Sequence, residues 1–173
     1  KFPVTDWIRT PAEFDYIVEP DLFHDLFGHV PLLFDPSYAD HIQAYGKGAL
    51  KAHALEHGTH GTEPIPGAVE MLSRLYWYTI EFGLRRDKNG SHDVSAYGAG
   101  ILSSYGEIEE FRGADLRPLD LLEMGTLEYD ITHYQPVLFC ADGMGELEDV
   151  VGGFFRAFDD DTPARLRNVA RVA

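Results

Sequence analysis

The sequence predicts an α+β fold that is mainly helical and carries a small peripheral sheet. The longest segments expected to be helical are residues 37–56, 68–86 and 144–157, whereas the segments expected to be extended are short. The chain has 173 residues, of which 45% are hydrophobic, so it can bury one sizeable core. It contains no internal repeat, and we expect a single domain over residues 1–173.

Shorter elements fill the intervals between these helices. Helices are also expected at residues 12–15, 21–27, 105–111 and 118–123, and extended pieces at 95–98, 127–132 and 136–140. Residues 57–67 are a linker rich in Gly, His and Pro, and Asp87 to Ser91 form a polar turn.

Two histidines lie close together in the segment Pro20–Pro31. Asp21 is typical of a helix N-cap, and the helix should run through the following apolar residues. Gly28 stands where a left-handed C-cap belongs. Pro31 should then prevent the helix from resuming.

His24 and His29 are five residues apart. On a continuous α-helix they would point about 140° away from each other, because each residue turns the helix by about 100°. If the helix stops at Gly28, His29 can leave it and fold back toward His24, and both imidazoles can bind one metal ion. The alternative is a partly solvated pair of histidines at a helix end that has no function.

A carboxylate lies inside an otherwise aromatic helical segment. On this segment Trp77, Glu81 and Leu84 fall on one side, at i, i+4 and i+7. A carboxylate buried among such neighbours needs a partner or a metal. Alternatively, Glu81 reaches solvent or pairs with Arg85. Together with the two histidines, it would complete the set of ligands that holds non-haem iron(II) and leaves half of the coordination sphere open.

Composition excludes several classes of function. With 29 acidic and 14 basic side chains, the formal charge is −15, which argues against a nucleic-acid or anionic-membrane surface. The chain has no apolar run long enough to span a bilayer and no signal-peptide pattern. A single cysteine, Cys140, excludes an internal disulfide framework and a multi-cysteine zinc site. We expect a cytoplasmic protein.

Four motifs occur in an order that is specific to one family: PDLFHDLFGHVPLL, LYWYTIEFGL, AYGAGILSSYGE and ITHYQPVLF. With these motifs the chain resembles the catalytic domain of the pterin-dependent aromatic amino acid hydroxylases, most closely the bacterial members. The resemblance runs from Phe2 to Asp142. It implies that His24, His29 and Glu81 are the ligands of Fe(II).

The resemblance also implies a substrate site. Arg9 matches the arginine that binds the substrate carboxylate, and Asp21 matches the acid that holds this arginine. The planar fork of Arg suits the task, because it can bond both carboxylate oxygens. Ser103 further resembles a hydroxyl donor that orients the first iron histidine. The remaining substrate positions implied by the resemblance are Trp77 and Phe82 around the ring, Gly100 and Ser103 in the pocket loop, and Ile131.

The positions that match the pterin site are Asp25, Ser73 and Tyr76. Judged by helical spacing alone, the aromatic residues of 76–82 are more typical of core, and the Gly-Ala-Gly stretch at 98–100 is more typical of a turn. The family's pterin-stacking phenylalanine has no counterpart in the chain, which we therefore expect to be N-terminally incomplete. Since the tetramerisation segment of animal members is also absent, we expect a monomer.

One histidine cluster matches no motif of this family. His53, His57 and His60 have the spacing of a zinc site, but two glycines interrupt the helix there. The interval 46–67 is also longer than in most relatives, and a polar, exposed insertion is the favoured interpretation.

The expected function is hydroxylation of L-phenylalanine to L-tyrosine with molecular oxygen, iron(II) and tetrahydrobiopterin or a related tetrahydropterin. By resemblance, Ile131 is aliphatic as in phenylalanine hydroxylases, where tyrosine hydroxylases have an acid, and Trp77 argues against the tryptophan enzymes. A tyrosine or tryptophan hydroxylase is the nearer alternative. The other is a non-catalytic metal-binding remnant that has lost its pterin site.

Overall fold

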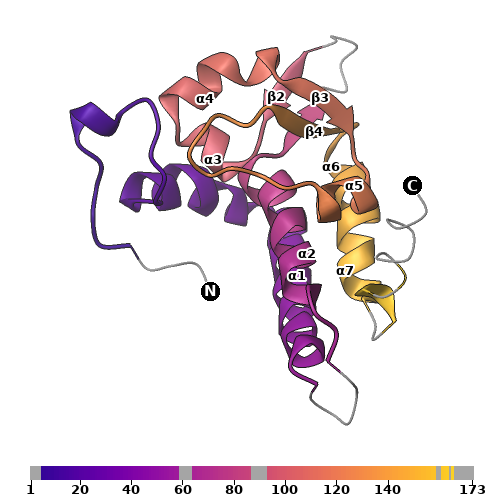
Figure 1. Cartoon of the computed structure of the whole chain (residues 1–173). Coiled ribbons are helices and arrows are strands. Elements are labelled where there is room, and N and C mark those ends of the chain that lie inside the picture. Colours follow the sequence, from indigo (N-terminus) through magenta and orange to yellow (C-terminus); the bar gives the residue numbers. More distant parts are fainter. Residues whose placement is uncertain (1–4, 59–63, 87–92, 159–160, 164, 166–173) are drawn as a thin grey trace.

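The computed structural model describes residues 5–58, 64–86, 93–158, 161–163 and 165 (Figure 1). Within these ranges, helices surround a small sheet, as the sequence predicts. The α-helices are α1 (Pro36–Glu56), α2 (Ala68–Tyr76), α3 (Ala99–Leu102), α4 (Tyr105–Glu110), α5 (Leu121–Thr126), α6 (Met144–Leu147) and α7 (Gly153–Ala157). The strands are β1 (Leu84–Arg86), β2 (Val94–Ala96), β3 (Asp115–Pro118) and β4 (Val137–Ala141).

Short 3-10 and π-helical segments connect or extend these elements. The 3-10 helices are Pro11–Glu13, Val30–Phe34 and Phe111–Gly113. The π-helical turns are His24–His29, Trp77–Glu81 and Glu148–Gly152. Two of the three π-helical turns carry the predicted metal ligands.

The sheet has the strand order β2-β1-β4-β3. β1 pairs antiparallel with β2, whereas β4 pairs parallel with both β1 and β3. β4 is therefore an inner strand, and Leu138, Phe139 and Cys140 are buried along it. Such a run of buried residues is typical of a strand that is covered on both faces.

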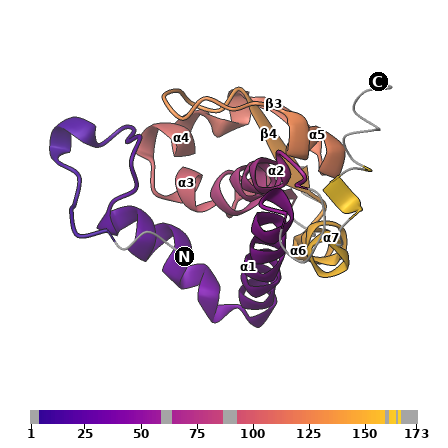
Figure 2. The same ribbon diagram turned by 60° about the horizontal axis from the view of Figure 1, so that its bottom comes forward.

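The main core lies between the long helices and β4. α1 and α2 lie side by side, and α7 with the π-helical turn before it lies next to α1 on the side away from the N-terminal segment (Figures 1 and 2). Tyr38 of α1, Leu72 and Leu75 of α2 and Phe139 of β4 are almost fully buried in one cluster. The start of α1 is fixed by Asp35, whose side chain accepts a hydrogen bond from the backbone N–H of Ser37 at 2.8 Å.

The prediction of one helix over 68–86 is wrong at its end. The helix changes to a π-helical turn at Trp77 and ends at Glu81, with Phe82 as its C-cap, and β1 begins at Leu84. A Cβ atom on Gly83 would lie 2.2 Å from the carbonyl oxygen of Thr79 and 2.3 Å from the ring of Tyr97. Gly83 therefore allows the chain to turn from the helix into the sheet within a very tight space.

Two other predicted elements differ from the structure, and one strand was not predicted. Residues 127–132 are not a strand, because the Asp130 side chain accepts hydrogen bonds from the backbone and hydroxyl of Thr132 and forms a local turn. β3 was not predicted, and the helix expected at 118–123 begins only at Leu121. The helix at 144–157 is confirmed as α6, the π-helical turn and α7 in succession, and the extended pieces at 95–98 and 136–140 correspond to β2 and β4.

The segment 46–67 is only in part a polar insertion. Its first half continues α1, and Ala52 and Leu55 pack into the core. The rings of His53 and His57 stack with centroids 4.2 Å apart. His60 and the polar turn expected at 87–91 lie outside the described residues. None of the helices in the described ranges combines the length and apolar character needed to cross a bilayer.

Candidate active site

The first two candidate ligands lie in a single π-helical turn, His24–His29. The expected stop at Gly28 is wrong, because Gly28 lies inside this turn and is not among the glycines with positive φ. A π-helix closes i→i+5 hydrogen bonds, so its turn is wider than that of an α-helix. Residues five apart then return to nearly the same side. This geometry resolves the conflict that an α-helix would impose on His24 and His29.

Pro31 also behaves differently from the prediction. The chain continues as a 3-10 helix over Val30–Phe34, with Pro31 near its start. Proline is tolerated there because the first turn of a helix does not need its N–H.

Gly28 is required for packing and not for a turn. A Cβ atom at this position would lie 2.8 Å from both the Cβ and the carbonyl oxygen of Ala99 in α3. The absence of a side chain lets the π-helical turn touch α3, which is followed directly by Ser103. The histidines are thereby held against the second predicted segment of the site.

Glu81 meets both histidines. The Nε2 atoms of His24 and His29 are 3.0 Å apart, and the Glu81 carboxylate oxygens lie 3.4 Å from the first and 3.2 Å from the second. In octahedral coordination with metal–nitrogen bonds of about 2.1 Å, neighbouring ligand atoms are about 3 Å apart. The two distances belong to different oxygens of Glu81, Oε2 toward His24 and Oε1 toward His29, and each has the spacing of neighbouring ligand atoms around one octahedral metal ion.

Ser103 fixes the tautomer of His24. The Ser103 hydroxyl donates its one proton to the carbonyl oxygen of Ala99 at 2.7 Å, so its oxygen must accept from His24 Nδ1–H at 2.8 Å. Ser103 is thus an acceptor toward the histidine, in contrast to the donor role that was expected. Since Nδ1 carries the proton, the Nε2 lone pair of His24 is directed toward Glu81, available to a metal.

The charge state of the cluster suits a divalent cation. Burial lowers the pKa of His24, which keeps the imidazole neutral. Burial alone would raise the pKa of Glu81, but the hydrogen bond from His29 and the nearby histidines outweigh it and lower that pKa. Glu81 is therefore ionised, and its largely buried negative charge beside two imidazoles favours a bound metal ion.

Asp21 caps the N-terminus of the helix that carries His24 and His29. It is fully buried and accepts a hydrogen bond from the backbone N–H of His24 at 2.9 Å, as the predicted N-cap should. It also accepts from Nε of Arg9 at 2.9 Å and from Nη2 at 2.7 Å. Although burial acts to raise the pKa of Asp21, these hydrogen bonds hold it well below its usual range.

The guanidinium group of Arg9 has hydrogen-bond donors that no acceptor among the described residues uses. A guanidinium has five N–H donors, of which two bond Asp21 and one bonds the carbonyl oxygen of Ser103. Two donors are left for another acceptor. Because Asp21 and Ser103 hold the guanidinium in place, a carboxylate would meet a group that is already oriented.

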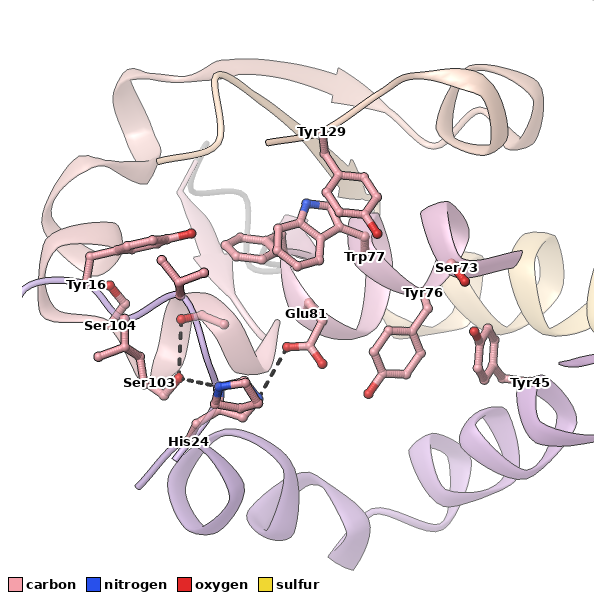
Figure 3. Close-up of a pocket in the computed structure, with 15 residues that line it drawn as sticks. Tyr16, His24, Tyr45, Ser73, Tyr76, Trp77, Glu81, Ser103, Ser104 and Tyr129 are labelled. Atoms are coloured by element: carbon pink, nitrogen blue, oxygen red, sulfur yellow. Dashed lines mark hydrogen bonds and ion pairs between the residues drawn. The ribbon is translucent and has the colours of Figure 1, made fainter. Parts of the chain in front are cut away.

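A cavity of about 260 Å³ lies next to the cluster (Figure 3). This volume suits a small ligand, since pockets for drug-sized molecules begin at about 300 Å³. The predicted site residues that line it are His24, Ser73, Tyr76, Trp77, Glu81, Phe82, Gly100 and Ser103. The lining residues that were not predicted are Tyr16, Ile17, Val18, Pro20, Tyr45, Ser104 and Tyr129.

Five predicted residues are not part of the cavity lining: Arg9, Asp21, Asp25, His29 and Ile131. Arg9 borders a second cavity that shares Ser103 and Ser104 with the first. Asp25 offers a carboxylate oxygen within 4.8 Å of ligand nitrogens of the two histidines, and it accepts a hydrogen bond from the Thr5 hydroxyl at 2.8 Å. Ile131 is 43% exposed and borders a separate shallow groove with Ser73 and Tyr129. Its carbonyl oxygen accepts from the Tyr16 hydroxyl at 2.7 Å, so its backbone holds a residue of the cavity wall.

Trp77 forms the broad aromatic wall of the cavity. It stacks on Tyr129, with ring centroids 4.3 Å apart and an interplanar angle of 10°, and packs against Phe82 at 4.4 Å. Figure 3 shows the Trp77 and Tyr129 rings face to face. Tyr129 belongs to no motif singled out in the sequence, and only the tertiary contact assigns it to the site.

A buried acid lies behind this wall. Glu107 is 1% exposed and accepts a hydrogen bond from the backbone N–H of Gln135 at 3.2 Å. Burial raises the pKa of Glu107 to about 7. A raised pKa in the folded state means that the carboxyl group contributes its full stability below its unfolded pKa of 4.5, and that this contribution is lost as the pH rises through about 7.

We expect Glu107→Gln to flatten the pH dependence of stability. The amide can still accept from Gln135 but carries no charge, so the variant should be more stable than the parent above pH 7, by roughly 3 kcal/mol at about 1.4 kcal/mol per pKa unit. Thermal denaturation of both proteins between pH 5 and pH 8 measures the difference. Parallel stability profiles over this range would contradict the assignment.

Comparison with known proteins identifies the family. The family model described as biopterin-dependent aromatic amino acid hydroxylase matches residues 1–166. The chain is 44% identical to a phenylalanine-4-hydroxylase of Chromobacterium violaceum, over 90% of this chain and 48% of that protein. It is 39% identical to a phenylalanine 3-hydroxylase of Streptomyces coeruleorubidus, over 95% of this chain and 54% of that protein.

Solved structures agree with this result. The Chromobacterium violaceum phenylalanine hydroxylase with bound cobalt matches with a TM-score of 0.75 and 40% identity, over 93% of this chain and 53% of that one. The same enzyme with iron(III) and 7,8-dihydrobiopterin matches with a TM-score of 0.71 and 39% identity, over 86% and 50%. The chain thus spans about half the length of the relatives it matches. Its fold is that of their catalytic domain, and the chain belongs to the biopterin-dependent aromatic amino acid hydroxylases.

Proposed function

We propose that this chain is the metal- and substrate-binding part of an iron(II)- and tetrahydropterin-dependent monooxygenase that converts L-phenylalanine to L-tyrosine with molecular oxygen. The observation that carries the proposal is the close approach of two imidazole nitrogens and one carboxylate. His24 Nε2 and His29 Nε2 are 3.0 Å apart, and one oxygen of Glu81 lies 3.4 Å from the first while its other oxygen lies 3.2 Å from the second. Two histidines and one carboxylate on one face are the ligand set of non-haem iron(II) oxygenases.

The three ligands would hold iron(II) and leave its other face open toward the cavity. Bound iron and tetrahydropterin supply the activation of oxygen, which no side chain can perform. The protein contributes orientation: Ser103 keeps the proton of His24 on Nδ1, and Glu81 balances the metal charge. These contacts preset the ligand positions before the metal binds.

The substrate would be held at its two ends. The two spare donors of Arg9 would bind the carboxylate, with Asp21 as the fixed counter-charge. Trp77 and Phe82 would enclose the ring and exclude water from the reacting face. Gly100 lies against Phe82, where a Cβ atom would be 2.8 Å from its ring, and so permits this close wall.

The pterin would take the other end of the cavity. Ser73 and Tyr76 line that end together with Tyr45, and the Tyr45 and Tyr76 rings are 4.9 Å apart. Asp25, close to both histidines, would face the pterin from the π-helical turn. We place Ile131 at the rim of the site and not in the ring pocket, because its side chain borders a separate groove.

The relatives differ in the ring position that they hydroxylate, and this position has to be proposed for this chain as well. Relatives of similar identity are named for hydroxylation at ring position 4 and at position 3. The preponderance of phenylalanine-4-hydroxylases among the relatives favours position 4. The names of the relatives give less support to tyrosine or tryptophan as the substrate. They also give less support to a non-catalytic metal-binding remnant.

Product analysis tests the proposal. The purified protein, loaded with iron(II) and given oxygen and tetrahydrobiopterin, is incubated separately with phenylalanine, tyrosine and tryptophan. We expect p-tyrosine from phenylalanine as the main product. A protein that binds iron in stoichiometric amount and yields no hydroxylated amino acid would establish the remnant alternative.

We also propose that the protein acts as a single-domain monomer in the cytoplasm. The thiol of Cys140 is free and buried, which is compatible with a reducing compartment. The strongly negative formal charge of −15 disfavours self-association through surface charges. Light scattering on the purified protein tests the oligomeric state.

A further inference from the structure

Gln135 uses every polar atom of its side chain. It is 4% exposed, and its Oε1 accepts a hydrogen bond from Trp77 Nε1–H at 3.0 Å. Its Nε2 donates to the carbonyl oxygens of Asp130 at 2.9 Å and His133 at 3.0 Å. Its backbone N–H donates to buried Glu107. A glutamine that is satisfied at all of these atoms has a fixed position.

These partners also fix which way the amide faces. Asp130 and His133 present carbonyl oxygens, which only accept, so the NH₂ group must point to them. The amide oxygen must then face the indole N–H, which only donates. Gln135 therefore joins the 130–133 turn to Trp77 in one orientation.

The hydrogen bond between Gln135 and Trp77 acts on an indole ring that the substrate would contact. The indole of Trp77 lines the cavity and stacks on Tyr129. Stacking sets the distance between the two planes but lets one ring slide or rotate over the other. The bond to Gln135 holds the polar edge of the indole and removes that freedom.

We propose that Gln135 is a positioning residue that fixes the Trp77 indole and thereby decides which ring carbon of the substrate faces the metal. The inference rests on the proposed function, in which Trp77 bounds the phenylalanine ring. Relatives named for position 3 and for position 4 have similar identity to this chain, so both products are found within one family. Misplacement of a reacting group by about 1 Å can cost 100-fold in rate.

Two substitutions separate the indole contact from the general stability of the turn. Gln135→Met and Gln135→Glu both lose the NH₂ donors to Asp130 and His133, but only Gln135→Glu keeps an oxygen that can accept from Trp77. We expect Gln135→Met to raise the ratio of m-tyrosine to p-tyrosine at least tenfold with iron content unchanged. Gln135→Glu should keep the product ratio of the parent protein, although both variants should lose thermal stability.

A third variant removes the donor and leaves Gln135 in place. Site-specific replacement of Trp77 by benzothienylalanine exchanges the indole N–H for sulfur with little change in ring shape. It should shift the product ratio in the same direction as Gln135→Met, and combining the two changes should add little further shift, because both break one bond. This variant also decides the matter if Gln135→Met fails to fold.

The outcomes distinguish this inference from the proposed function. If the parent protein forms no hydroxylated phenylalanine, the proposed function fails. If the parent forms p-tyrosine and the benzothienylalanine variant keeps its product ratio, only the role of Gln135 is overturned. An equal shift in Gln135→Met and Gln135→Glu would overturn it too, since the turn and not the indole bond would then be responsible.

Discussion

His29→Ala should remove most of the bound iron and nearly all hydroxylation while leaving the helical content largely intact. Its Nε2 belongs to the cluster of candidate ligands, 3.0 Å from His24 Nε2 and 3.2 Å from Oε1 of Glu81. Loss of a residue that only orients a ligand costs about 10–100-fold in metal affinity, so loss of a ligand should cost at least that much. Iron per protein by elemental analysis, circular dichroism and product formation measure the three effects.

His41→Ala is the matched control. His41 is likewise buried, at 1% exposed, but it lies in α1 beside the Phe155 ring, outside the cluster of candidate ligands. This variant should lose stability through the cavity it creates, yet keep its iron. Normal iron stoichiometry in His29→Ala, or equal loss of iron in both variants, would refute the assignment of the metal centre.

Arg9→Ala should keep iron but raise the KM for phenylalanine by roughly ten- to more than a hundredfold. The estimate corresponds to the loss of a charge-assisted hydrogen bond of about 1.5–3 kcal/mol. Phenethylamine, which lacks the carboxylate, should be nearly indifferent to the substitution. Steady-state kinetics on both compounds, with the iron content of each preparation, measure the contrast.

The same substitution leaves Asp21 buried without its cation, which is destabilising in itself. Arg9→Lys controls for this effect, because it keeps a positive charge beside Asp21 but loses the planar fork. It should fold better than Arg9→Ala and still bind phenylalanine weakly. If phenylalanine and phenethylamine suffer equally in both variants, Arg9 only anchors the N-terminal segment to Asp21.

The sequence by itself predicted which side chains come together in the candidate site. Motif order and residue type named His24, His29 and Glu81, and Asp21 was recognised as a helix cap because capping is a local interaction between near neighbours. The helical character of the fold was likewise predictable, since apolar spacing is a property of short segments. Where a helix would end, and in which form, was predicted less well.

Only the tertiary structure decided how the ligands converge. A π-helical turn is not favoured by its own sequence, and here it is stabilised by the contact of Gly28 with Ala99, 71 residues further along the chain. Tyr129 and Gln135 joined the site in the same way, through a ring stack and a hydrogen bond to Trp77 that span more than 50 residues. Local patterns cannot specify such contacts, because their free energy is gained only when distant segments pack together.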